Sequence, residues 1–377
     1  MTRTRDVIVI GGGIVGLATA YFLAREKLGV TVIERGAVGR EASWAAAGYL
    51  TFQGSSTRPG PRLELTRASA EMYERWIGEI GEHTAADTGF LRTGLLEVCV
   101  DEAEVEEARA RAAWQRRAGF AVEWLDARAT RQRQPWLAPD LPVQGGLLLP
   151  DVAQVRPPRL LRALTDAVRA LGVEIVEHTP VTGLTRSGSR VTGVALASGE
   201  RPASALVVNA AGSWAAQISP EMALMPVKPV KGTIVLLETA ARPSREIVIS
   251  SRGSIYPRAD GRVLVGATME DVGYDRQVRL DAVATLIGQA TALMPRLGAA
   301  SFVTAWTGLR PFSHDNLPYL GPIPALDGAY VATGHYRSGI LLAPVTGLLL
   351  KEMILKEKPT LPLEPYLVSR LGQAASR

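Results

Sequence analysis

The stretch Asp6-Val7-Ile8-Val9-Ile10-Gly11-Gly12-Gly13-Ile14-Val15-Gly16 decides how the N-terminal part of this chain folds. Its β-branched run is typical of a strand buried on both faces of a parallel sheet. Gly11, Gly13 and Gly16 have the spacing G-x-G-x-x-G, which permits a tight turn, a close approach of backbone to a pyrophosphate, and contact between strand and helix. Ile14 to Arg25 is predicted to be a helix whose positive N-terminal end faces the phosphates.

A second strand, Val30 to Ile33, is predicted to end at Glu34, whose carboxylate can accept hydrogen bonds from ribose hydroxyls. Arg35 could bind a 2′-phosphate, but Glu34 would repel that group, so the pattern favours FAD or NAD over NADP. The alternative is a glycine-rich turn in which Glu34 only caps a strand. The order of strand, glycines, helix, strand and acid favours the nucleotide site.

The composition is that of a globular protein. The chain has 377 residues, 47% hydrophobic and 21% charged, which predicts two lobes that can interleave in sequence. The net charge of +5 is spread along the chain, and basic and acidic residues alternate on expected solvent-facing helices such as Glu102 to Arg117, so a nucleic-acid partner is not expected. The sequence leaves open whether the chain forms a homo-oligomer.

Cysteine and histidine offer little reactive chemistry. The single cysteine, Cys99, lies in an apolar run and is predicted to be a buried strand thiol. No metal site is expected, because the four histidines lie far apart without metal-ligand spacing: His83, His178, His314 and His335. Redox chemistry would therefore need an organic cofactor.

Two apolar stretches could be mistaken for membrane or export segments. Val7 to Leu23 is interrupted by glycines and lacks an evident cleavage site. Ile340 to Leu355 contains Pro344 and Gly347 and is predicted to be a buried helix. A cytoplasmic protein without a membrane span is the expectation.

Beyond Glu34, the small-residue stretch Gly39 to Gly48 would let backbone pack against a flat group, which a plain NAD site does not need. Here the chain resembles the D-amino-acid oxidase superfamily of FAD enzymes, and within it most closely the bacterial glycine oxidases of the thiamine pathway. The resemblance covers nearly the whole chain. Its blocks are Gly11–Gly16, Arg40–Gly48, Glu177–Val181, Val263–Met269, Gly308–Pro311 and Gly334–Pro344.

The resemblance implies an α/β fold in which a Rossmann-like FAD-binding domain is interleaved with an α+β substrate domain built on an antiparallel sheet. The expected FAD-binding domain comprises 1–50, 150–220 and 305–377, and the expected substrate domain 51–149 and 221–304. The residue pattern agrees in outline. It predicts a helix-rich segment 61–133, a strand-rich segment 227–268 and a helix over 280–293.

FAD is expected to bind non-covalently, because Cys99 lies far from the C-terminal cysteine that attaches flavin in related sarcosine oxidases. Gly339 would begin a second helix whose positive end suits the flavin N1–C2 region, although an ordinary helix-start turn is the alternative. The expected FAD-binding residues are Gly11, Gly13, Ile14, Val15, Gly16, Glu34, Arg35, Ala42, Ser43, Ala47, Gly48, Tyr49, Val181, Gly212, His335, Tyr336, Arg337, Ser338, Gly339, Ile340 and Leu341.

Arginine's planar fork fixes a carboxylate bidentately, and Arg310 matches the carboxylate-binding arginine of glycine oxidase. A surface ion pair is its alternative role, but its apolar neighbours argue against full exposure. Arg337 is the second candidate, between flavin and substrate, with a backbone or phosphate contact as its alternative. Met269 is the residue that the family has after Gly-Ala-Thr. Arg310, Arg337 and Met269 are the expected catalytic residues.

The pocket departs from that family at several positions. Ser254 stands where glycine oxidases have a tyrosine, and Arg252 where they have a histidine. Tyr256 is expected to face away from the pocket, whereas Tyr49 is expected to refill part of it. Arg310, Arg337, Ser254 and Tyr49 form the expected substrate pocket, which should accept a larger or differently charged substrate than glycine.

These features predict an FAD-dependent oxidase of a small amino acid or N-methyl amine, such as glycine, sarcosine or a D-amino acid. Hydride transfer to flavin N5 would give an imino acid and, with oxygen, hydrogen peroxide. One alternative is a dehydrogenase that reduces a quinone or a protein. Another is a non-catalytic flavin-binding module.

Overall fold

The predicted strand, helix and second strand at the N-terminus form β1 (Val7–Ile10), α1 (Ile14–Arg25) and β2 (Val30–Ile33). A computed structural model describes residues 5–54, 56 and 58–371. All residues of β1 and β2 are buried, and both strands run parallel. This is the burial that continuous β-branched runs require.

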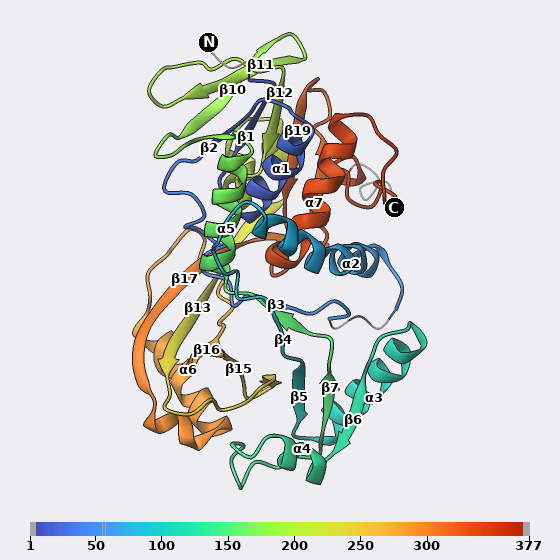
Figure 1. Ribbon diagram of the computed structural model, residues 1–377, viewed down its shortest axis with the longest axis vertical. Helices are drawn as coiled ribbons and strands as arrows, with labels where there is room; N and C mark the ends of the chain where they lie inside the picture. Colours follow the sequence, from blue (N-terminus) through green and yellow to red (C-terminus); the bar gives the residue numbers. More distant parts are fainter. Residues whose placement is uncertain (1–4, 55, 57, 372–377) are drawn as a thin grey trace.

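These strands belong to a six-stranded sheet at one end of the molecule (Figure 1). Its order is β18-β19-β12-β1-β2-β9, and only β18 runs antiparallel to its neighbour. The additional strands are β9 (Glu174–Val176), β12 (Leu206–Asn209), β18 (Tyr319–Pro322) and β19 (Ala329–Thr333).

The two faces of this sheet are covered differently. Alternate residues of β1 point into two cores: Val7 and Val9 pack with helices, whereas Ile8 and Ile10 pack with a hairpin. The helical face is covered by α1, α5 (Pro157–Ala170) and α7 (Gly339–Ile354), and the opposite face by β10 (Val181–Ser187) and β11 (Arg190–Leu196).

An eight-stranded sheet forms the other end of the molecule (Figure 1). Its order is β17-β13-β16-β15-β14-β5-β7-β6, and every pair is antiparallel except β14 with β5. Its strands are β5 (Leu95–Cys99), β6 (Glu123–Asp126), β7 (Gly145–Leu149), β13 (Val227–Glu238), β14 (Ile247–Ser250), β15 (Gly253–Pro257), β16 (Arg262–Gly266) and β17 (Ser301–Ser313).

Helix α6 (Leu280–Leu293), which has the predicted bounds, packs on one face of this sheet through Leu286, Ala290 and Leu293. Helix α3 (Glu102–Arg117) covers the opposite face through Ala108 and Ala112. The remaining elements are β3 (Tyr49–Leu50), β4 (Leu91–Arg92), β8 (Ala153–Gln154), α4 (Ala127–Arg133), η1 (Gly212–Gln217), η2 (Met222–Leu224) and η3 (Pro295–Ala299).

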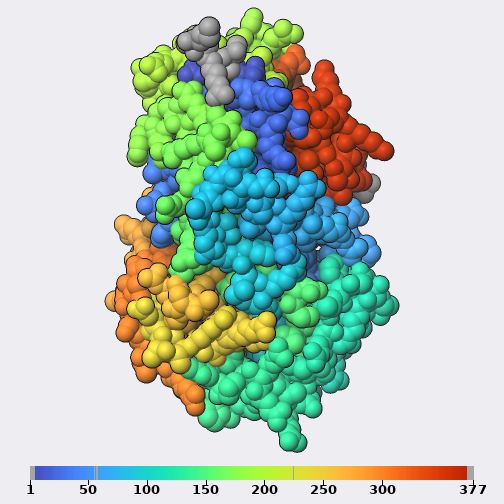
Figure 2. Space-filling model, in the orientation of Figure 1, coloured from blue at the N-terminus to red at the C-terminus, as the bar shows by residue number. Residues whose placement is uncertain are grey.

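Helix α2 (Pro61–Gly81) lies between the two ends and packs against α7 (Figure 1). In the space-filling view, the light-blue residues of this region lie across the middle of the face shown (Figure 2). The proposed division into 1–50, 150–220 and 305–377 against 51–149 and 221–304 stays a proposal. Two observations bear on these boundaries. Most of β17 is assigned to the FAD-binding domain, but it pairs along its length with β13 of the other sheet. Helix α2 is assigned to the substrate domain, but it packs in the same core as α1 and α7.

The mixed α/β fold class is as predicted, and Cys99 is a buried strand thiol in β5. The helix-rich interpretation of 61–133 was incomplete, because β4 and β6 lie within it in addition to β5, the strand expected at Cys99. Their partners β7, β8 and β14 are distant in sequence, so no hairpin pattern marks them. Within the described residues, no helix combines the length and the apolar character needed to span a bilayer.

Candidate active site

A cavity of about 480 Å³ lies where the two large sheets meet. Its walls come from the ends of β1 and β2, residues 41–49, η1, β15, β17 and the start of α7. The volume is within the usual range of small-molecule sites. Segments that are far apart in sequence therefore converge on one site.

The glycine turn after β1 forms one end of the cavity. Gly11 has φ +103°, and a Cβ atom there would lie 2.6 Å from the Ala210 carbonyl oxygen, so no larger residue fits. A Cβ on Gly16 would overlap the Gly11 carbonyl oxygen. Gly16 therefore lets α1 pack on the turn, and it does not line the cavity. At the start of α1, the Ile14 N–H donates to Ser43 Oγ at 3.0 Å.

Glu34 is buried at the end of β2. Its carboxylate accepts hydrogen bonds from the N–H groups of Gly12 at 2.8 Å and Gly36 at 2.9 Å. These bonds fix the carboxylate at the cavity wall, and each oxygen keeps acceptor capacity for a ribose hydroxyl.

Arg35 is engaged within the protein. Its guanidinium carbon lies 3.6 Å from the centre of the Trp214 ring, and its Nη2 lies 2.7 Å from Glu41 Oε1. A guanidinium that is stacked and paired in this way is not free to bind a 2′-phosphate. This arrangement supports the sequence-based preference against NADP.

The small-residue stretch forms a wall of backbone and methyl groups. A Cβ atom on Gly308 would lie 2.6 Å from Ala45 Cβ, so β17 and this stretch are in direct contact. The stretch is fixed from outside: Trp306 Nε1 donates to the Ala45 carbonyl at 3.1 Å, and Arg258 donates to the Ala47 carbonyl. The resulting surface fits a flat, elongated group.

Arg310 projects from β17 into the other end of the cavity. Its Nη1 donates to the carbonyl oxygens of Thr268 at 3.0 Å and Lys231 at 3.3 Å. Burial lowers the pKa of Arg310, and the neighbouring Arg337 charge lowers it further. A guanidinium nevertheless stays protonated in proteins.

Arg337, two residues before α7, donates through Nη2 to the Tyr49 hydroxyl oxygen at 3.2 Å. This contact raises the pKa of Arg337. Among residues 5–54, 56 and 58–371, no carboxylate forms an ion pair with Arg310 or Arg337. The cavity therefore offers two guanidinium groups to an incoming anion.

Three tyrosines and Met269 complete this end of the cavity. The rings of Tyr49 and Tyr256 lie 5.4 Å apart, and the Tyr336 hydroxyl lies 3.4 Å from Met269 Sδ. Met269 lines the cavity but is 65% exposed, so it lies at the cavity rim.

Two expectations for this pocket were wrong. Tyr256 lines the cavity together with Ser254, because residues two apart in a strand point to the same face. Tyr256 thus supplies an aromatic ring beside the position where the family tyrosine is missing. Arg252 lies exposed in the turn between β14 and β15 and does not line the cavity, so it adds no charge there.

Most of the residues proposed from the sequence meet at this cavity. The lining members are Gly11, Gly13, Ile14, Val15, Glu34, Arg35, Ala42, Ser43, Ala47, Gly48, Tyr49, Val181, Gly212, Ser254, Met269, Arg310, His335, Tyr336, Arg337, Gly339 and Ile340. Ser338 and Leu341 do not line it. Ser338 accepts a hydrogen bond from Arg62, and the Leu341 side chain is in the core behind α7.

Sequence reasoning missed several lining residues, among them Trp214, Ile234 and Thr333. Trp214, Ile234 and Thr333 lie on η1, β13 and β19, three elements that are far apart in sequence, and no local motif marks them. The turn Ala210-Ala211-Gly212 also lines the cavity, and its run of small residues, which allows close approach, is the kind of signal that the sequence offers for this wall.

His335 lies buried beside the cavity, and its Nε2 is 3.0 Å from Thr346 Oγ1. Burial lowers the pKa of His335 to about 3, so the ring is neutral near pH 7. Cys99 is not among the lining residues. In the described part of the chain, no group of three or more His, Cys, Asp or Glu side chains could hold a metal ion.

The fold and cavity define a dinucleotide-binding protein with a guanidinium-bearing pocket at the far end of the nucleotide groove. The residues present fit FAD: a glycine turn at a helix start, a fixed acid at the end of β2 and a long wall of small residues. Residues 6–353 match the family described as FAD dependent oxidoreductase, so the chain belongs to this family of FAD-dependent, amino-acid-oxidase-type enzymes.

Three relatives illustrate the similarity. Glycine oxidase from Pseudomonas putida is 35% identical over 96% of this chain and 98% of its own length. The bifunctional protein ThiO/ThiG of Synechocystis is 37% identical over 95% of this chain and 53% of its own length. The crystal structure of glycine oxidase from Geobacillus kaustophilus superposes with a TM-score of 0.92 at 32% identity, covering 98% of this chain and 99% of that one.

Proposed function

We propose that this chain oxidises the carbon–nitrogen bond of a small amino acid or N-methyl amino acid, such as glycine, sarcosine or a D-amino acid. The product is an imino acid that water hydrolyses. The observation that carries the proposal is Arg310, a half-buried cation aimed into the cavity without a carboxylate partner in the described chain. An α-carboxylate supplies the missing charge, and bidentate pairing fixes its orientation.

When bound, FAD would supply the redox chemistry by accepting a hydride from the substrate α-carbon, and with oxygen as acceptor the electrons would appear as hydrogen peroxide. The chain's own contribution is binding and orientation. The residues proposed to hold the nucleotide are those of the glycine turn, Glu34, the stretch from Ala42 to Tyr49, and the start of α7. Arg310 would anchor the carboxylate, and Arg337 would occupy the space between carboxylate and ring.

The aromatic residues set the proposed substrate size. Ser254 leaves space that a tyrosine would fill, but Tyr256 and Tyr49 pack together beside it. We therefore propose a pocket for a small substrate that tolerates a methyl group on nitrogen or on the α-carbon. This favours sarcosine and D-alanine alongside glycine.

The test is anaerobic mixing of the purified yellow protein with glycine, sarcosine, D-alanine and L-alanine. Loss of the visible absorbance of oxidised flavin identifies the substrate. Readmission of air then distinguishes the acceptors: rapid return of colour with peroxide supports an oxidase, whereas slow return that a quinone accelerates supports a dehydrogenase. A panel that leaves the absorbance unchanged would refute the proposal.

A further inference from the structure

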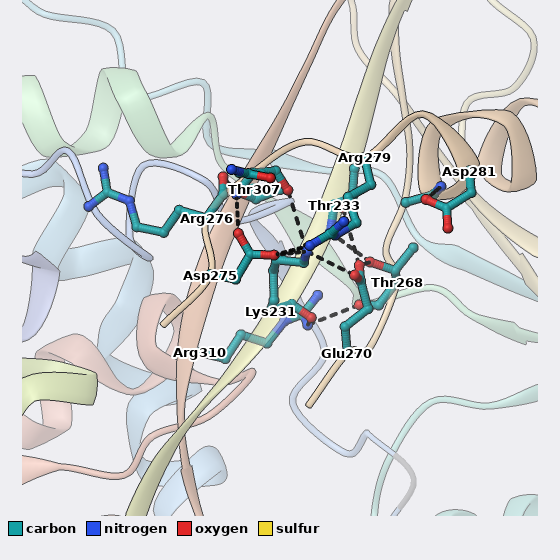
Figure 3. A network of polar contacts seen from close by, with 12 residues as sticks. Lys231, Thr233, Thr268, Glu270, Asp275, Arg276, Arg279, Asp281, Thr307 and Arg310 are labelled. Atoms are coloured by element: carbon teal, nitrogen blue, oxygen red, sulfur yellow. Dashed lines mark hydrogen bonds and ion pairs between the residues drawn. The ribbon is translucent and has the colours of Figure 1, made fainter. Parts of the chain in front are cut away.

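Lys231 on β13 is fully buried although it carries a charge. Its ammonium nitrogen lies 2.9 Å from Glu270 Oε2 and 3.5 Å from Asp275 Oδ2 (Figure 3). Removing a charge from water costs several kcal/mol, and an ion pair offsets that cost only when its geometry is good. A buried ion pair is therefore weak evidence for stability, and this one lies behind the cavity wall, next to the guanidinium of Arg310.

The ion pair fixes the segment that follows β16. The Lys231 N–H donates to the Glu270 carbonyl at 2.9 Å, and the Glu270 N–H donates back to the Lys231 carbonyl at 3.0 Å. Thr268 Oγ1 donates to Glu270 Oε1 at 2.6 Å and accepts from the Thr233 N–H at 2.8 Å. The lowered pKa of Glu270, whose carboxylate receives these bonds against the opposing effect of burial, agrees with a charged partner for Lys231.

The same arrangement brings two carbonyl groups together at Arg310. The carbonyl oxygens of Lys231 and Thr268 both accept hydrogen bonds from Arg310 Nη1, and Figure 3 shows the Arg310 side chain beside Lys231. The guanidinium lies against Gly232, where a Cβ atom would collide with it. The carbonyl groups of Lys231 and Thr268 thus form a carbonyl frame that orients Arg310. The ion pair between Lys231 and Glu270 joins the two segments that carry these carbonyl groups.

We propose that Lys231 and Glu270 form a positioning pair for the substrate's carboxylate: they hold the carbonyl frame that directs Arg310 into the cavity. Lys231 itself does not line the cavity, so it acts through Arg310 and not by touching the substrate. This inference rests on the proposed function, because it assigns Arg310 to the carboxylate.

The chain provides a matched control. Lys228 lies on the same strand and pairs with Asp271 in the same following segment, but both side chains are exposed, at 52% and 64%. Lys228 makes no contact with the carbonyl frame of Arg310. An exposed ion pair contributes little, so Lys228→Met tests the loss of a lysine from β13 without loss of the frame.

The experiment compares Lys231→Met, Glu270→Gln and Lys228→Met as FAD-loaded enzymes. Two quantities are measured: KM and kcat for the best substrate of the panel, and the dissociation constant of acetate, a carboxylate without an amino group, from the change it causes in the flavin spectrum. We expect Lys231→Met and Glu270→Gln to raise KM and the acetate dissociation constant about tenfold, with kcat changed less, because a charge-assisted contact is misaligned. Lys228→Met should leave both within about twofold.

A double-mutant cycle separates positioning from general stability. If Lys231 acts through Arg310, Lys231→Met adds little to the acetate affinity already lost in Arg310→Ala. Additive effects would overturn the inference. If Lys231→Met does not fold, the milder pair Thr268→Val and Thr268→Ser replaces it: valine removes the hydroxyl bonds and should weaken acetate binding, and serine keeps them and should restore it.

The proposed function and the positioning role of Lys231 are refuted by different results. Unchanged acetate affinity in Arg310→Ala would remove Arg310 as the carboxylate anchor and with it that part of the proposed function. Weakened binding in Arg310→Ala together with unchanged binding in Lys231→Met, Glu270→Gln and Thr268→Val would remove only the positioning role.

Discussion

Arg337 and Tyr49 are joined across the cavity by a hydrogen bond of 3.2 Å, in which the guanidinium donates to the phenol oxygen. The bond connects the segment just before α7 with β3, two parts of the chain that are far apart in sequence. Tyr49 also packs against Tyr256, so it fixes both a charge and an aromatic wall. The orientation of Arg337 in the pocket thus depends on one hydroxyl group.

Tyr49→Phe should weaken substrate binding modestly. The ring contact with Tyr256 remains, but Arg337 loses its hydrogen-bond acceptor, and a bond to a charged group contributes about 1.5–3 kcal/mol at most. Because water can replace the hydroxyl in this open pocket, we expect KM to rise about three- to tenfold with little change in kcat. Steady-state kinetics check this expectation. Tyr330→Phe, outside the cavity, is the control, and equal KM values in the two variants would contradict the role of Tyr49.

Arg310→Ala should lower kcat/KM by about 30- to 1,000-fold, which corresponds to about 2–4 kcal/mol from a lost bidentate, charge-assisted contact. Arg310→Lys keeps the charge but not the planar fork, so it should recover only part of the loss. Kinetics with the substrate identified by anaerobic reduction measure both effects. A variant with unchanged kcat/KM would show that the carboxylate binds elsewhere.

The nucleotide half of the fold could be predicted because its signals are local. The β-branched run, the glycine spacing and the acid of β1, α1 and β2 follow one another within the first tenth of the chain, and helix α1 has the predicted bounds. The eight-stranded sheet was predicted only in outline. Its parallel pair, β5 with β14, joins residues 95–97 to 247–249, and no short-range pattern encodes such a pairing.

The candidate site likewise contains residues that local sequence signals predict and residues that only the fold reveals. Arg310 could be proposed from the family resemblance and from its apolar neighbours. Lys231, by contrast, has the sequence context of an ordinary polar residue in a strand. Only the fold shows that Lys231 is buried and that Glu270 is its partner. Tyr256 was misjudged for a different reason: the period of two along β15, applied correctly, places it beside Ser254.

Glu41→Gln should loosen FAD binding at low salt. The Glu41 carboxylate lies 2.7 Å from Arg35 and 2.9 Å from Arg276, so it joins the nucleotide side of the cavity to the segment that follows β16. Partly exposed pairs contribute about 0.2–1 kcal/mol each, so the loss of both pairs predicts an FAD dissociation constant about two- to thirtyfold higher.

Titration of apoprotein with FAD measures this constant for Glu41→Gln. The difference from wild type should shrink as salt is added, because screening weakens exposed ion pairs. Identical FAD affinity in Glu41→Gln and wild type at low salt would show that the ion pairs of Glu41 do not help to hold FAD.

His335 should make the protein lose stability as the pH falls below about 6.5. Burial lowers the pKa of His335 in the folded state to about 3, whereas the unfolded chain has the ordinary value near 6.5. Between these values the unfolded state binds a proton that the folded state does not, so protonation favours unfolding. The loss approaches about 1.4 kcal/mol per pH unit and reaches about 2 kcal/mol at pH 5.

His335→Gln lacks this titration, so its urea midpoint should fall less between pH 7 and pH 5 than that of wild type. The stability of His335→Gln at pH 7 can differ from that of wild type, because only the change of stability with pH reports the titration of His335. His83→Gln, at an exposed position, should retain the wild-type slope. Parallel pH profiles for wild type and His335→Gln would mean that the His335 ring takes up a proton within the folded protein, and the buried pair with Thr346 would then have to open to water.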